Sequence, residues 1–220
     1  MTRIVDPEEI VRKSFAHIRS RMDPGDHSPG VIPIIERVVH AAGMLDLVDD
    51  VAYSDDFVAA GQHALIRRCR IYCDSDMVAA GLTPSLQFRR DQIRVMLDHA
   101  DVDRHAREHR TTRSAAAIDV WQSQLGGAII VIGNAPTALF KLLDAIRSGA
   151  ARPAVIIGIT VWFVGAAESK EALIRHPVPT PYFTVRGTRG GSAMAAAAMN
   201  ALVRMTAGQS NASLTGAEGS

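Results

Sequence analysis

Three apolar runs that each end in a glycine-containing polar turn constrain this fold more than any other feature. The clearest lies at 129–138, I-I-V-I-G-N-A-P-T-A, and similar patterns recur near Gly158 and Gly187. A helix rich in small residues follows each turn, as is typical of parallel strands joined by crossover helices. Helix N-termini at that sheet edge present backbone N–H groups, so the pattern predicts a rim that binds anions without a metal.

The remaining pattern extends this unit into a doubly wound, mostly parallel α/β sheet. Seven helices are expected: one that begins at Asp6-Pro7, one that contains Ile34 and ends at Gly43, one between Ser54 and Leu65, one at Thr112–Gln122, one at Thr137–Arg147, one that begins at Ser169, and one at Gly191–Val203. The stretch Asp98–His109 is expected to be an exposed helix or loop. Strands are expected at Ile71–Cys73, Gln92–Met96, Ile129–Ile132, Ala154–Ile157 and Tyr182–Val185.

The length and composition favour a single domain at residues 1–207. The segment 208–220, G-Q-S-N-A-S-L-T-G-A-E-G-S, lacks core-forming residues and is predicted to be disordered. The two cysteines, Cys69 and Cys73, are too few for a disulfide framework or a zinc cage, and both are expected to be reduced, with Cys73 buried.

The net charge and the hydropathy of the sequence argue against two classes of partner, nucleic acids and membranes. The formal net charge of +1 argues against a nucleic-acid partner, which usually requires a clustered basic excess. The N-terminus has no apolar signal region and no apolar run reaches membrane-spanning length, so a cytoplasmic location without membrane contact is expected. Only three of the 24 basic residues are lysines. A codon bias is the simpler explanation of this excess of arginine over lysine. The alternative is an anionic ligand, which the planar donor groups of arginine would suit.

The common catalytic signatures are missing from the sequence. It contains no G-x-G-x-x-G, no G-K-[ST] ending, no G-x-S-x-G and no H-E-x-x-H. The one helical histidine pair, His105 and His109, has no obvious third ligand, so neither a metal nor a cofactor is expected. FMN binding by a doubly wound domain stays open as a minor alternative. A site in this chain should therefore work by positioning and proton transfer.

His40 is the strongest candidate for a proton donor. It lies on the helix E-R-V-V-H-A-A-G, with Arg37 one turn earlier on nearly the same face, and small residues follow it. Periodicity alone nevertheless favours a satisfied core histidine at this position. Arg113 begins another helix, where it could project toward a ligand or be an ordinary surface residue. Arg186 and Arg189 flank the last strand-to-helix turn.

Several long motifs together resemble the precorrin-8X methylmutase family of cobalamin biosynthesis. They are V-I-G-N-A-P-T-A-L-F, F-V-G-A-A-E-S-K-E-A-L and V-R-G-T-R-G-G-S-A-M-A-A-A-A, preceded in order by R-K-S-F-A-H-I-R, R-V-V-H-A-A-G-M, C-D-S-D-M-V-A-A-G and T-T-R-S-A-A-A. The resemblance covers about Ser14 to Ala201. It implies a three-layer, flavodoxin-like fold and a homodimer whose tetrapyrrole pocket lies near the subunit interface.

The resemblance also implies a reaction and the residues that perform it. A methyl group migrates from carbon eleven to carbon twelve of precorrin-8X without a cofactor, giving hydrogenobyrinic acid. His40 corresponds to the family's proton donor. The expected substrate-binding positions, all within or beside the quoted motifs, are Ser14, Arg37, Arg113, Asn134, Thr137 and Arg186.

Two stretches depart from the family pattern. Thr160 and Trp162 stand where family members usually have proline and glycine, and 86–103 is unlike the family. Three alternatives therefore stay open: a corrinoid-binding paralogue without isomerase activity, a carrier of hydrogenobyrinic acid, and a methylmutase acting on cobalt-precorrin-8.

Overall fold

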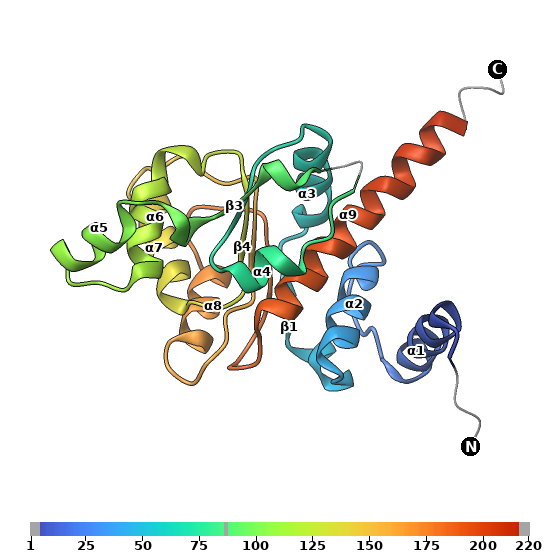
Figure 1. The fold of residues 1–220 in the computed structure, drawn as a ribbon. Coiled ribbons are helices and arrows are strands. Elements are labelled where there is room, and N and C mark those ends of the chain that lie inside the picture. Colours follow the sequence, from blue (N-terminus) through green and yellow to red (C-terminus); the bar gives the residue numbers. More distant parts are fainter. Residues whose placement is uncertain (1–4, 86–87, 216–220) are drawn as a thin grey trace.

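The computed structural model describes residues 5–85 and 88–215 and forms a mixed α/β sheet protein (Figure 1). Its strands are β1 (Val51–Tyr53), β2 (Ile71–Cys73), β3 (Ile93–Val95), β4 (Ile129–Ile132), β5 (Val155–Gly158) and β6 (Tyr182–Val185). They are ordered β1-β6-β5-β4-β2-β3, and every neighbouring pair except β1–β6 is parallel. The predicted mostly parallel sheet is confirmed.

The edge strand β1 was not predicted. It pairs antiparallel with β6, placing Val51 opposite Val185 and Tyr53 opposite Phe183. The strand is only three residues long and directly follows a 3₁₀ helix at Leu45–Asp50, so it has neither an apolar run nor a turn signal of its own. Its pairing depends on the neighbouring strand, which sequence periodicity cannot reveal.

Helices cover both faces of the sheet. They are α1 (Pro7–Arg21), α2 (Ile32–Ala42), α3 (Phe57–Ile66), α4 (Asp76–Gly81), α5 (Val102–Glu108), α6 (Arg113–Trp121), α7 (Pro136–Arg147), α8 (Ala166–Ile174) and α9 (Ser192–Thr215). Alternate strand residues point to opposite faces. Ile71 and Cys73 therefore join an apolar cluster under α2, α3 and α9, whereas Tyr72 joins another under α6 and α7. Figure 1 shows these two helix groups on either side of the strands.

The longest helix, α9, packs closely against α2 (Figure 1). Met199 and Leu202 of α9 are fully buried in the same cluster as Ile35 and Val38 of α2. The helix continues past its predicted end at Val203 to Thr215 and so enters the segment for which the sequence predicts disorder. Residues 216–220 of that segment lie outside the described residues, as do 1–4 and 86–87.

The expected helix or loop at 98–109 contains α5, and Cys73 is buried with a free thiol, as predicted. Among the helices of the described ranges, none combines the length and the apolar character needed to cross a lipid bilayer.

A buried carboxylate joins the ends of β2 and β4. Asp74 is 2% exposed and accepts backbone hydrogen bonds from Gly133 (3.0 Å), Asn134 (2.8 Å) and Ala135 (2.8 Å). Burial raises the pKa of the Asp74 carboxyl, and the three donors oppose that rise. These N–H groups belong to the turn for which the sequence predicted anion binding. The structure corrects that expectation, because an internal carboxylate already occupies them.

We predict that Asp74→Asn lowers the free energy of unfolding by about 2–4 kcal/mol, because an amide nitrogen would face backbone donors and leave at least one unpaired. Urea unfolding followed by circular dichroism measures this. Asp76→Asn is the control, since Asp76 is exposed two residues away, and it should change stability by less than about 1 kcal/mol. Equal losses in both variants would contradict this role of Asp74.

Candidate functional site

The structure brings Ser14, Arg37 and His40 together between α1 and α2. Ser14 Oγ lies 2.9 Å from His40 Nδ1, and the Phe15 and His40 rings stack with their centroids 4.8 Å apart. The guanidinium carbon of Arg37 also lies over the Phe15 ring, 4.4 Å from the ring centroid. His40 is exposed, so the expectation from periodicity of a core histidine is wrong.

Local sequence explains this placement. Ile35, Val38 and Val39 are the buried stripe of α2, whereas Arg37 and His40 are three residues apart on the side that faces α1. Phe15 is the buried aromatic residue of α1 and forms the surface between the two helices. The apolar neighbours of His40 in sequence thus belong to a different face of the helix.

A positively charged hollow adjoins this group. It has a volume of about 350 Å³, and its lining includes Phe15, Arg37 and Arg204. Burial lowers the pKa of Arg37, and the charge of Arg204 adds to that effect. In the described part of the chain neither arginine has a carboxylate within ion-pair distance, whereas Arg19, at the same hollow, is held by Glu36 at 2.7 Å. Two unpaired guanidinium groups in a hollow favour an anionic ligand.

A second group of predicted residues lies at the N-termini of α6 and α7. Thr112 caps α6 through the backbone N–H of Ala115 at 3.2 Å, and its hydroxyl lies 2.8 Å from that of Thr137. Arg113 is exposed and forms an ion pair with Asp103 at 2.5 Å. Both Arg113 and Thr137 can be reached from solvent, so each is available to a ligand at this edge.

Trp162, one of the departures from the family pattern, lies at the same edge. Its indole Nε1 donates a hydrogen bond to Asn134 Oδ1 at 3.3 Å. Its φ of 102° is in the left-handed region that favours glycine and costs a non-glycine residue about 1–3 kcal/mol. Trp162, Phe163 and Val164 are 61%, 89% and 87% exposed, respectively. These three residues form an apolar tip between β5 and α8, which we call the 162–164 tip.

The two groups do not meet within the chain. No contact recorded for residues 5–85 and 88–208 joins Ser14, Arg37 or His40 to Asn134 or Thr137. Figure 1 shows α1 and α2 on the opposite side of the sheet from α6 and α7. Arg186, the remaining predicted site residue, forms an ion pair with Glu171 at 2.5 Å and belongs to neither group.

Comparison with known proteins identifies the family. The sequence model of the precorrin-8X methylmutase family matches residues 9–205. The chain belongs to this family. A precorrin-8X methylmutase of Pseudomonas aeruginosa is 48% identical over 199 residues, covering 90% of this chain and 96% of the relative. A cobalt-precorrin-8 methylmutase of Priestia megaterium is 34% identical, covering 90% of this chain and 88% of the relative.

A solved structure of the precorrin-8X methylmutase family has the same architecture. The crystal structure of precorrin-8X methyl mutase from Thermus thermophilus matches with a TM-score of 0.82 and 35% sequence identity, covering 92% of this chain and 97% of that one. The mixed α/β fold with its mostly parallel sheet is therefore shared with a methylmutase over almost the full length of both chains.

Lys170 of this methylmutase-family chain has a role that the sequence did not indicate. Its side chain is fully buried, and its ammonium donates to the backbone carbonyls of Thr160 (3.0 Å) and Arg189 (2.8 Å). A Cβ on Gly190 would lie 2.1 Å from the Thr160 carbonyl oxygen, so the two loops touch. Lys170 thus joins the loops that follow β5 and β6.

The other residues that sequence reasoning missed are Phe15, Asp74 and Arg204. Two of the missed residues had a signal in the sequence. Asp74 directly follows a buried strand, and Lys170 is one of only three lysines. Arg189 is also held in place, by ion pairs with Asp46 at 2.6 Å and with Asp50.

We predict a pH dependence of stability from Lys170. Burial lowers its pKa to about 8 from an ordinary 10.5. Between these values the unfolded chain binds more protons than the folded chain, so this group makes the free energy of unfolding rise with pH, by about 3 kcal/mol across the whole window. Below pH 8 the buried Lys170 is charged, and its full unfavourable contribution to the free energy of unfolding is present. Urea unfolding at pH 7, 8.5 and 10 should show a difference between wild type and Lys170→Met that changes across this window. A constant difference would contradict the shift.

Proposed function

We propose that this protein is an isomerase of cobalamin biosynthesis that converts precorrin-8X to hydrogenobyrinic acid by moving a methyl group from carbon eleven to carbon twelve. The observation that carries the proposal is the exposed His40, fixed by Ser14 beside a hollow with unpaired arginines. Family membership and the names of the relatives support the reaction class.

In this mechanism His40 is the general acid. Its Nδ1 is engaged by Ser14 Oγ, so Nε2 is the nitrogen left to deliver a proton. Protonating the macrocycle redistributes its π electrons and lowers the barrier to migration of the methyl group. The same proton leaves when conjugation is restored, so that substrate and product are isomers. The carbon–methyl bond breaks at carbon eleven and forms at carbon twelve, and no nucleophile is required.

The arginines near His40 position the substrate. Arg37 and Arg204 supply planar donor forks suited to the carboxylates of a tetrapyrrole periphery. A bound polyanion would also offset the positive charge of these arginines near His40. No metal or cofactor has a part in this scheme.

The finer fold assignment follows the strand order. Without β1, the parallel strands run β3-β2-β4-β5-β6, which is the 2-1-3-4-5 order of flavodoxin-like sheets. Helices on both faces of the sheet support a three-layer arrangement, and we propose that residues 1–207 form a single domain. The order reverses between β2 and β4, where ligands of such sheets usually bind and where Asn134 lies beside Asp74.

We infer that the functional unit is a homodimer with the substrate at the interface. Two groups of predicted site residues lie apart within one chain, and the exposed 162–164 tip offers apolar surface for a second copy. A symmetric dimer would bring the α1–α2 group of one chain toward the Asn134 group of its partner. We place this dimer in the cytoplasm, without a nucleic-acid or membrane partner.

The substrate is proposed to be metal-free. The relative named precorrin-8X methylmutase is 48% identical, against 34% for the cobalt-precorrin-8 methylmutase of Priestia megaterium. The second candidate, binding or carriage of a corrinoid without chemistry, is favoured by one observation: Trp162 brings an indole and a strained backbone to the edge where Asn134 lies.

We predict that His40→Ala folds and binds hydrogenobyrinic acid but turns precorrin-8X over about 10²–10⁴-fold more slowly, since it lacks the general acid. Turnover is measured by absorbance and binding by spectral titration. The control is His17→Ala, an exposed histidine elsewhere on α1, which should retain wild-type turnover. Wild-type turnover in His40→Ala would overturn the assignment of the acid.

We predict complementation between two inactive variants if the dimer shares its site. Arg113→Glu and His40→Ala, each inactive alone, should regain about one quarter of wild-type activity after unfolding and refolding together, because half of the dimers are mixed and one of their two sites is intact. Each variant refolded alone is the control. A mixture with no more activity than the separate variants would contradict a site built from two chains.

A further inference from the structure

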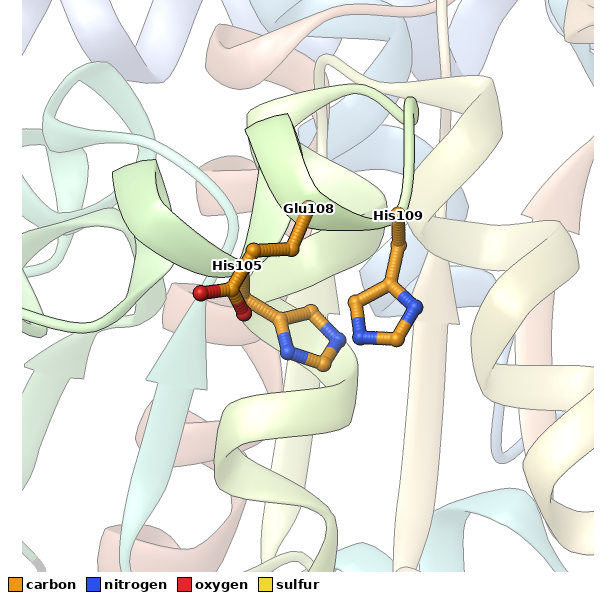
Figure 2. A group of neighbouring side chains, drawn as sticks. All are labelled: His105, Glu108 and His109. Atoms are coloured by element: carbon orange, nitrogen blue, oxygen red, sulfur yellow. The ribbon is translucent and has the colours of Figure 1, made fainter.

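Three potential metal ligands meet on α5 and the residue that ends it. His105, Glu108 and His109 each offer one ligand atom, and these atoms lie within 4.8 Å of one another. The i, i+3, i+4 spacing puts all three on one side of the helix, and Figure 2 shows the two imidazole rings side by side. Their centroids are 4.1 Å apart. The expectation that this pair lacks a third ligand is therefore wrong, since Glu108 is adjacent.

A carboxylate on the next helix orients one of these rings. His105 Nε2 lies 3.1 Å from Asp119 Oδ2 on α6, and both side chains are largely shielded, at 25% and 22% exposed. Lys141 on α7 holds the other oxygen of Asp119 at 3.0 Å. A carboxylate that pairs with a histidine fixes its ring and strengthens it as a ligand, the arrangement that supports histidines at metal sites.

Little competes with a cation for the other two side chains. Glu108 pairs with Arg104 at 3.3 Å, but both residues are more than half exposed, and an ion pair of that kind contributes little and breaks easily. His109 is exposed and has no recorded partner among the described residues other than the His105 ring. Two nitrogens and one carboxylate oxygen, open to water, match the donors that Zn²⁺ and neighbouring divalent transition metals prefer over Mg²⁺ or Ca²⁺.

We propose that His105, Glu108 and His109 form a binding site for one divalent transition-metal ion of the zinc type, with water completing its coordination. The ion would hold the C-terminal end of α5 in place, and the contact of His105 with Asp119 joins that end to α6. The site is separate from His40 and its hollow and does not depend on the proposed function. Its role is structural, so a bound ion stabilises the fold and leaves turnover unchanged.

The test uses the full chain without an affinity tag, stripped of metal by a chelator that is then removed. Isothermal titration with Zn²⁺ should show one ion per chain, and Zn²⁺ should raise the unfolding temperature. The variants His109→Ala and His105→Ala/His109→Ala should weaken binding at least tenfold and abolish that rise. His109→Ala removes a solvent-exposed ring and keeps the Asp119 contact, so it retains the fold if the double variant does not.

The matched control is His63→Ala, an exposed histidine on α3, which should bind Zn²⁺ as the wild type does. A Co²⁺ titration adds a second readout, since nitrogen ligation produces visible absorption bands that should be lost in His109→Ala. Two results would overturn the proposal: wild-type protein that shows no saturable Zn²⁺ binding, or binding that is unchanged in His109→Ala.

Discussion

The contact on which the rest of the structure depends is the buried Asp74 carboxylate against three backbone N–H groups. It closes the junction of β2 and β4, where the strand order reverses, and it fixes the turn from which α7 begins. Asn134 and Thr137 owe their positions to this turn. Because an internal carboxylate takes these three N–H groups, they are not open to an anionic ligand. Arg37 and Arg204, which line the hollow beside α2, have no carboxylate within ion-pair distance among the described residues.

The loops at the neighbouring sheet edge are held by a different means. Lys170 spans the carbonyls of Thr160 and Arg189, and Gly190 permits the two loops to touch. A buried amine is costly to place in a protein interior, and its lowered pKa records that cost. The exposed 162–164 tip lies beside these joined loops. The buried Thr160 and the exposed Trp162 both lie in the segment between β5 and α8.

The sequence predicted β4, β5 and β6 because each is an apolar run with a glycine-containing turn behind it. It missed β1, whose three residues form a strand only because β6 lies beside them. It identified Arg37 and His40 as neighbours on a helix face, but periodicity assigned His40 to the core. The burial of a helix side depends on what packs there, and α1 approaches that side through Phe15. Long-range contacts of this kind, like that of Lys170 with the Thr160 carbonyl, have no local signature.

The central claim is that this chain catalyses an isomerisation and does more than bind a corrinoid. The most direct test mixes purified protein with a large molar excess of precorrin-8X under anaerobic conditions and follows the visible absorption spectrum. The account predicts full conversion to the hydrogenobyrinic acid chromophore over many turnovers. A spectrum that shifts only in proportion to the protein added, and then stays constant, would contradict it and would identify the chain as a binding protein.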